Sequence, residues 1–234
     1  MKVAIWIHAA SGADAMNSQT ANQGGITSNR SLSSLIPAGG MRFAFWASIV
    51  VAAAAVLRRV FAIANPPRSV PPQLAALDAY FAAHAYLTLT HILCALVFVL
   101  LTPWVILWPG RSALAEKLVY PLGVIVGMTA YGMSFHAVGG WIERSAVLFF
   151  NTLFLFALGR ANFFRRQSET VRKQEWLLRS IVILLGIATT RPIMGIFFAT
   201  SPLTHLEPRQ FFGIAFWIGF SINTIGIELW LRSR

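Results

Sequence analysis

About six long apolar stretches, separated by short polar connections, run along most of the chain. Each stretch is close to the roughly 20 residues that an α-helix needs to cross about 30 Å of hydrocarbon. Because the connections are short, helices that follow one another should be antiparallel neighbours. The pattern predicts an all-α, polytopic transmembrane helical bundle whose spans comprise residues 43–64, 83–108, 118–138, 146–164, 176–200 and 211–231.

Residues 1–40 are rich in Ser, Asn, Gln and Gly, and they lack periodic apolar content beyond a short run at residues 3–10. We therefore expect a disordered leader in front of a transmembrane domain at residues 41–234. The short apolar run is marginal for a signal peptide. A start codon placed too far upstream, with the true start at Met16 or Met41, is an equally good interpretation.

The composition excludes a soluble globular protein. Of the 234 residues, 56% are hydrophobic and 12% are charged, whereas about a quarter of the residues in soluble domains are charged. The net charge of +11 comes from basic residues dispersed among the connections, so we expect the lipid bilayer and not nucleic acid as the partner. The single cysteine, Cys94, excludes an intramolecular disulfide.

The basic residues also indicate an orientation. The connections on the side of the two termini carry ten Lys and Arg residues, and those on the other side carry five. Short loops rich in Lys and Arg stay in the cytoplasm. The sequence therefore predicts a multi-pass protein of the bacterial inner membrane with both termini in the cytoplasm.

Four of the five histidines are expected on the outer side of the bundle: His84 and His91 on one face of the second helix, His136 near the outer end of the third, and His205 in the fifth connection. Asp78 and Glu143 are expected on the same side. Imidazole is the commonest protein ligand of transition metals, and histidines on facing helices hold haem. These residues are candidate ligands of a haem or a transition metal. The alternative is that each imidazole only binds a carbonyl or water.

The last two helices carry a second polar set. Arg179 and Glu228 fall at similar depth near the inner end, and a structural ion pair is the preferred interpretation, with proton relay as the alternative. Arg191 has no obvious acidic partner within a span, so we expect it to bind an anion: a headgroup, a haem propionate or a substrate carboxylate. Asn223 is a second candidate ligand contact, and Pro192 should kink its helix.

These two helices resemble a family of predicted membrane proteins, domain of unknown function 2306. The family has His-x-x-Trp-Met-x-Arg-Ser at the start of such a helix, and residues 174–180 read Gln-Glu-Trp-Leu-Leu-Arg-Ser. His91 resembles the histidine of an early span, so the similarity covers residues 43–231. The pattern is completed by Arg191, Phe216, Trp217, Asn223 and Glu228.

Two departures limit what the resemblance implies. Gln174 stands where the family has histidine, and residues 115–123 replace a motif of the type His-x-x-Gly-Arg. Chemistry that depends on those histidines is therefore not expected from this chain. Because the family has no settled activity, the resemblance implies the fold and the topology only.

No residue pattern indicates a particular catalytic reaction, and three hypotheses follow. The first is a membrane redox protein that holds haem or metal at His84, His91 and His136, with a membrane redox protein as partner. The second is a transporter or small-ligand permease with Arg191, Asn223 and Glu228 along its pathway. The third is a non-enzymatic assembly or lipid-interacting protein, in which polar residues join helices and a second copy of the chain is a candidate partner.

Overall fold

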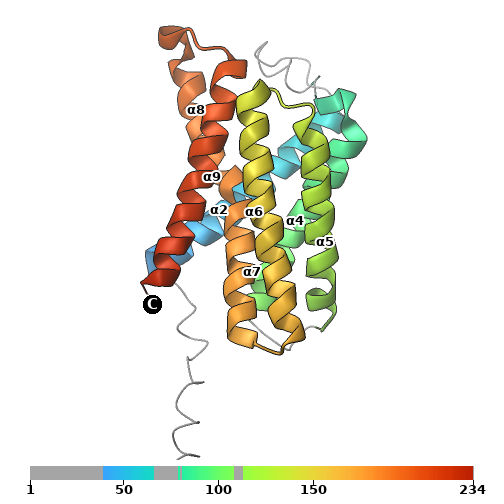
Figure 1. Cartoon of the computed structure of the whole chain (residues 1–234). Coiled ribbons are helices and arrows are strands. Elements are labelled where there is room, and N and C mark those ends of the chain that lie inside the picture. Colours follow the sequence, from blue (N-terminus) through green and yellow to red (C-terminus); the bar gives the residue numbers. More distant parts are fainter. Residues whose placement is uncertain (1–38, 66–78, 80, 108–112, 234) are drawn as a thin grey trace, which may run out of the picture. The chain divides into compact units, whose positions relative to one another are not determined.

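The structure is a computed structural model that describes residues 39–65, 79, 81–107 and 113–233 (Figure 1). Within these ranges the chain is α-helical and has no strand, which confirms the predicted all-α class. The expected leader, apart from Gly39 and Gly40, lies outside the described residues, and so does Asp78. The helices discussed below belong to one compact unit that begins at Gly40.

Within the described ranges, this unit contains seven long helices. Six segments are long and apolar enough to cross a membrane, with α7 and α8 together forming one of them, so the protein is a multi-pass membrane protein. The helices are α2 (Gly39–Ala64), α4 (Ala85–Leu107), α5 (Ala113–Ser134), α6 (Gly140–Arg166), α7 (Thr170–Leu184), α8 (Gly186–Thr204) and α9 (Pro208–Arg232).

Helices α4, α5, α6 and α7 form a four-helix bundle in which each helix packs on the next and α4 closes the ring against α7 (Figure 1). Helix α9 packs against α6 and α7, and α8 pairs with α9. Helix α2 crosses the bundle obliquely and contributes Ile49 and Ala52 to the core. Short connections between antiparallel helices produce this ring, as the sequence pattern predicts.

Small residues bring α5 and α6 close together. A Cβ atom built on Gly123 would stand 2.5 Å from Cδ2 of Leu158, and one built on Gly127 would stand 2.5 Å from Cδ2 of Leu155. Helices in a bilayer associate through close packing of this kind, because the lipid supplies no hydrophobic driving force between them. The GxxxG pattern of α5 is therefore a packing feature.

The fifth span is broken at Leu185, whereas the sequence suggests a kink at Pro192. As one straight helix, Thr170–Thr204 would be about 52 Å long, more than the roughly 40–45 Å of a whole bilayer. At the break, the backbone N–H of Ala188 bonds the Leu185 carbonyl at 2.9 Å, three residues back. Ring atoms of Phe220 pack where Gly186 lacks a side chain, so α9 fixes the position of the break.

The third span ends earlier and the fourth begins earlier than expected. Helix α5 stops at Ser134, so His136 lies in the turn beyond the helix and not one turn before its end. The turn leads to Gly140, whose φ of 61° suits glycine, and α6 starts there. Consequently Glu143 lies in the first turn of α6 and not in a loop.

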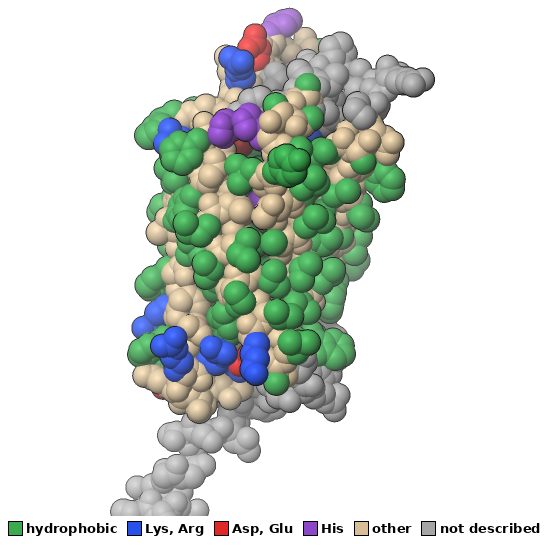
Figure 2. Space-filling model, turned by 90° about the vertical axis from the view of Figure 1, so that its right-hand side faces the viewer, with side chains coloured by type: hydrophobic (Ala, Val, Ile, Leu, Met, Phe, Trp, Pro, Cys, Tyr) green, Lys and Arg blue, Asp and Glu red, His purple; other side chains and the backbone are tan. Residues whose placement is uncertain are grey.

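The outside of the bundle suits a lipid environment. Figure 2 shows a broad hydrophobic surface, with Lys and Arg side chains gathered toward one end and His, Lys or Arg and acidic side chains near the other. Large apolar side chains such as Leu100, Val124 and Phe156 are about half exposed. Acyl chains would cover this surface, as expected for helices that cross a bilayer.

Candidate functional site

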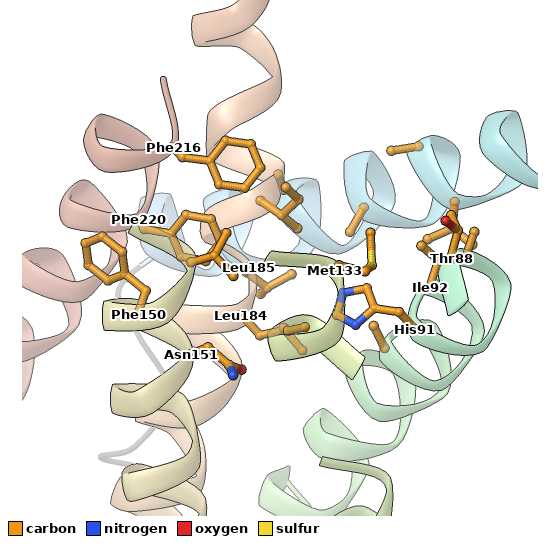
Figure 3. A pocket seen from close by; sticks show the side chains of 18 of the residues that line it. Thr88, His91, Ile92, Met133, Phe150, Asn151, Leu184, Leu185, Phe216 and Phe220 are labelled. Carbon is orange, nitrogen blue, oxygen red and sulfur yellow. The ribbon is translucent and has the colours of Figure 1, made fainter. Parts of the chain in front are cut away.

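A cavity of about 230 Å³, here called the central cavity, lies inside the bundle (Figure 3). All seven described helices contribute to its lining. Most of the lining is apolar, and small residues of α2 such as Ala52 and Ala55 form one wall. Close-packed interiors contain few voids larger than a water molecule, so a cavity of this size is a candidate ligand site.

Phenylalanine side chains form the wall contributed by α6 and α9. The rings of Phe150 and Phe220 stack with their centroids 5.3 Å apart, and Phe216 stacks on Phe220 at 5.8 Å. Figure 3 shows these three rings beside Leu184 and Leu185, at the junction of α7 and α8. The wall is large, apolar and held in place by contacts between its own members.

His91 reaches the cavity from α4. Its Nδ1 lies 3.0 Å from Oγ1 of Thr129, and that hydroxyl oxygen also lies 2.7 Å from the Ile125 carbonyl. The imidazole and the hydroxyl therefore share a hydrogen bond between α4 and α5, and which of them donates depends on the tautomer of His91.

Glu143 and Arg191 meet at the end of the cavity where α5 ends and α6 begins, which we call the α5–α6 end. Both line the cavity, and their charges interact. Glu143 is 9% exposed, and its Oε2 accepts the backbone N–H of Gly139 at 2.5 Å. The sequence offered Arg191 no acidic residue within a span; in the structure the charge of Glu143, in α6, acts on it without a direct ion pair. The fourth span was expected to begin at residue 146, which left Glu143 in a loop.

The guanidinium of Arg191 has N–H donors that the described protein groups do not use. Among the described residues it donates no hydrogen bond, although it carries five N–H donors. Its side chain remains accessible. Donors left without an acceptor in a low-dielectric site are costly, so the position favours an anionic or strongly polar ligand.

His84 and His136 lie side by side, with their ring centroids 4.0 Å apart and their planes inclined by 44°. His136 lines the cavity and His84 does not. The two axial ligands of one haem must stand on opposite faces of the porphyrin, so two rings in contact do not fit that role. A structural zinc site needs four ligands, and in the described part of the chain no group of three or more His, Cys, Asp or Glu is placed to hold a metal.

The other predicted site residues are not part of the cavity. His205 is exposed, ends α8 with a φ of 53°, and its backbone N–H bonds the Ser201 carbonyl at 2.8 Å. Asn223 joins three helices: its Oδ1 accepts from Thr189 at 2.7 Å and its Nδ2 donates to the Val182 carbonyl at 2.9 Å. In the structure, the side chain of Asn223 bridges the two sides of the α7–α8 break.

Arg179 and Glu228 form the ion pair that the sequence suggests, with Nε and Oε1 2.6 Å apart. The Arg179 guanidinium also lies 4.6 Å from the centroid of the Trp176 ring. The pair joins α7 to α9 and does not line the central cavity. A structural role accounts for both side chains.

Sequence reasoning missed three polar contacts that hold the bundle. Asn151 donates to the Gly127 carbonyl at 2.9 Å, and Gln174 donates to the Ile106 carbonyl near the end of α4 at 3.0 Å. Lys173, read as one of the topology-setting basic residues, is buried and bonds Glu116 at 2.9 Å. A buried amide inside an apolar span was a detectable signal for Asn151. The partner of Lys173 had no signal in the sequence.

The chain was compared with protein-family models, curated proteins and solved structures, and none of them matches it. The site is therefore interpreted from its own geometry.

Proposed function

We propose that this protein binds a small amphipathic molecule in its central cavity, as a ligand-binding protein or permease of the bacterial inner membrane with both termini in the cytoplasm. We also propose that it belongs to the domain of unknown function 2306 family, on the strength of residues 174–180, Arg191, Asn223 and Glu228.

One observation carries the functional proposal: a largely apolar cavity within the membrane-spanning bundle is lined by His91, Glu143 and Arg191. Polar and ionisable groups are expensive inside a bilayer and are retained for function. Ligand sites combine an apolar lining with a few convergent polar groups, as this cavity does.

The rival hypotheses account for less of the structure. The contact between His84 and His136 does not suit a haem held between these two rings, which leaves the redox hypothesis without that pair of axial ligands. Asn223, Arg179 and Glu228 do join helices, as an assembly protein would require. That role gives no reason for a cavity with charged residues in its wall.

The orientation rests on the basic residues at the other end of the bundle, where α6 ends and α7 begins. Arg165, Arg166 and Arg172 lie there. Retention of basic loops in the cytoplasm would place the α5–α6 end of the cavity toward the periplasm.

Filling the cavity tests the proposal. Ala55 lines the cavity, whereas Ala54, the preceding residue of α2, is exposed and does not. We expect protein purified in mild detergent to retain a bound small molecule in native mass spectrometry. Ala55→Phe should remove that molecule because the new ring occupies the cavity, and Ala54→Phe should leave it bound.

Equal occupancy in both variants would contradict the proposal. A Soret absorption band, or a stoichiometric transition metal in the purified protein, would favour the redox hypothesis instead.

A further inference from the structure

We infer that the ligand of the central cavity is a single-chain anionic amphiphile: its head binds Arg191 at the α5–α6 end, and its chain runs between α4 and α6 toward the middle of the bilayer. This inference rests on the proposed function and names the class of ligand.

The head follows from Arg191. Its guanidinium lines the cavity and, within the described ranges, donates no hydrogen bond to the protein. A planar guanidinium binds a carboxylate or a phosphate with two parallel hydrogen bonds, and a neutral hydroxyl cannot match both. The low dielectric of the bundle interior strengthens this interaction.

The carboxylate of Glu143 does not remove the preference of Arg191 for an anionic head group. Its carboxylate accepts the backbone N–H of Gly139, directly before the first residue of α6. The N-terminus of a helix carries about half a positive charge, which compensates part of the carboxylate charge. The charge of Arg191 is therefore incompletely balanced from this side, and an anionic head completes it.

The acyl chain of the ligand is inferred from the length of the cavity along α4 and α6. On α6 the lining runs from Glu143 to Phe154, and on α4 it runs from Thr88 to Val99. Each stretch covers twelve residues of helix, and the eleven rises between its ends give the cavity a length of about 16 Å. That length is close to half of the roughly 30 Å hydrocarbon core, which is the depth of one leaflet.

The size of the cavity limits the ligand to one chain. Its volume of about 230 Å³ lies below the roughly 300–1,000 Å³ typical of ligand pockets. Stacked rings of Phe150 and Phe220 bound it on one side. A narrow, apolar, leaflet-deep cavity with an arginine at one end matches a fatty acid or a lysophospholipid with an anionic head.

The experiment uses the full chain in nanodiscs of phosphatidylcholine. A photoactivatable analogue of palmitic acid is cross-linked to the protein, and palmitic acid, palmityl alcohol, palmityl amine or palmitoyl lysophosphatidic acid competes for the site. The four competitors share the chain and differ in the head. We expect the anions to compete about tenfold better than the alcohol, the factor that one charge-assisted hydrogen bond supplies.

Arg191→Gln should abolish the preference for anions, and Arg191→Lys should keep part of it. Arg144→Gln is the matched control, since Arg144 lies one residue after Glu143 but faces the Phe135 and Trp141 rings and not the cavity. The better of the two anionic competitors identifies the source of the head, carboxylate or phosphate.

Two results would overturn the inference: an alcohol that competes as well as the acid in the wild-type protein, or an anion preference that survives in Arg191→Gln. Failure of the proposed function looks different. In that case the probe would label wild type and Ala55→Phe equally, and no competitor would reduce the labelling.

Discussion

Individual polar residues of this protein fall into two groups with different surroundings. Lys173 and Gln174 are at most 7% exposed, and each binds a partner on another helix and does not line the cavity. Arg191 and His91 line the cavity. The first group stabilises the bundle, since a buried polar group without a partner costs about 1–3 kcal/mol. The second group is where binding is expected.

Substitution of Lys173 tests whether the buried polar contacts stabilise the bundle. Lys173→Met should lower the melting temperature clearly, because Glu116 loses its partner in a partly buried position, and breaking a buried pair costs up to about 3–5 kcal/mol. Arg172→Met should change it little, because the pair of Arg172 with Glu169 is exposed and such pairs contribute at most about 1 kcal/mol. Both melting temperatures can be measured by heating the protein in detergent and quantifying the folded fraction by size-exclusion chromatography. Equal losses would contradict the structural role of the Lys173–Glu116 pair.

At the scale of elements, the break at Leu185 is the main irregularity. It separates α7, which packs in the four-helix ring, from α8, which pairs with α9 and carries Arg191. Asn223 of α9 binds both sides of the break, through the Val182 carbonyl and the Thr189 hydroxyl. Helix α9 thereby sets the position of Arg191 relative to the ring.

Asn223→Ala should loosen this junction. The Val182 carbonyl loses its donor, and hydrogen bonds between membrane helices contribute about 0.6–1.7 kcal/mol each. Hydrogen–deuterium exchange should become faster in peptides that span residues 182–190. Thr224→Ala is the control, because the Thr224 hydroxyl bonds only the Phe220 carbonyl of its own helix. Unchanged exchange in Asn223→Ala would show that packing alone fixes the break.

The sequence predicted the elements better than their ends. Length and apolar composition locate the spans, because any segment that crosses hydrocarbon must satisfy its backbone internally. The break at Leu185 was not predictable, since it depends on Asn223 and Phe220 from another helix and not on Pro192, which lies further along within α8. The charge interaction of Glu143 with Arg191 was missed because the start of α6 was placed six residues too late.

At the scale of the whole molecule, the described helices provide six candidate spans with a basic end, and Glu143 of the cavity lining lies in the first turn of α6, toward the opposite end. The fold itself does not determine which end faces the cytoplasm. The basic residues do, through the retention of Lys and Arg during insertion. Orientation decides from which leaflet an amphipathic ligand would enter.

Cysteine labelling tests the orientation. Thr204 is exposed at the end of α8, and Ser233 is exposed just after α9. In intact spheroplasts, a membrane-impermeant maleimide should label Thr204→Cys, because the proposed orientation places that end in the periplasm, and should not label Ser233→Cys. Both variants should be labelled after permeabilisation. The reverse pattern would show that the termini face the periplasm.

Because helices from both ends of the described chain line the cavity, the cavity can form only late in membrane insertion. Helix α2 is the first described helix to leave the ribosome and α9 is the last, and both contribute wall residues, Ala55 and Phe220 among them. No partial chain that has released only its early helices into the membrane can therefore enclose a ligand. Under the proposed function, ligand capture requires that the helices from α2 to α9 have all entered the membrane, and occupancy of the cavity would report that they have.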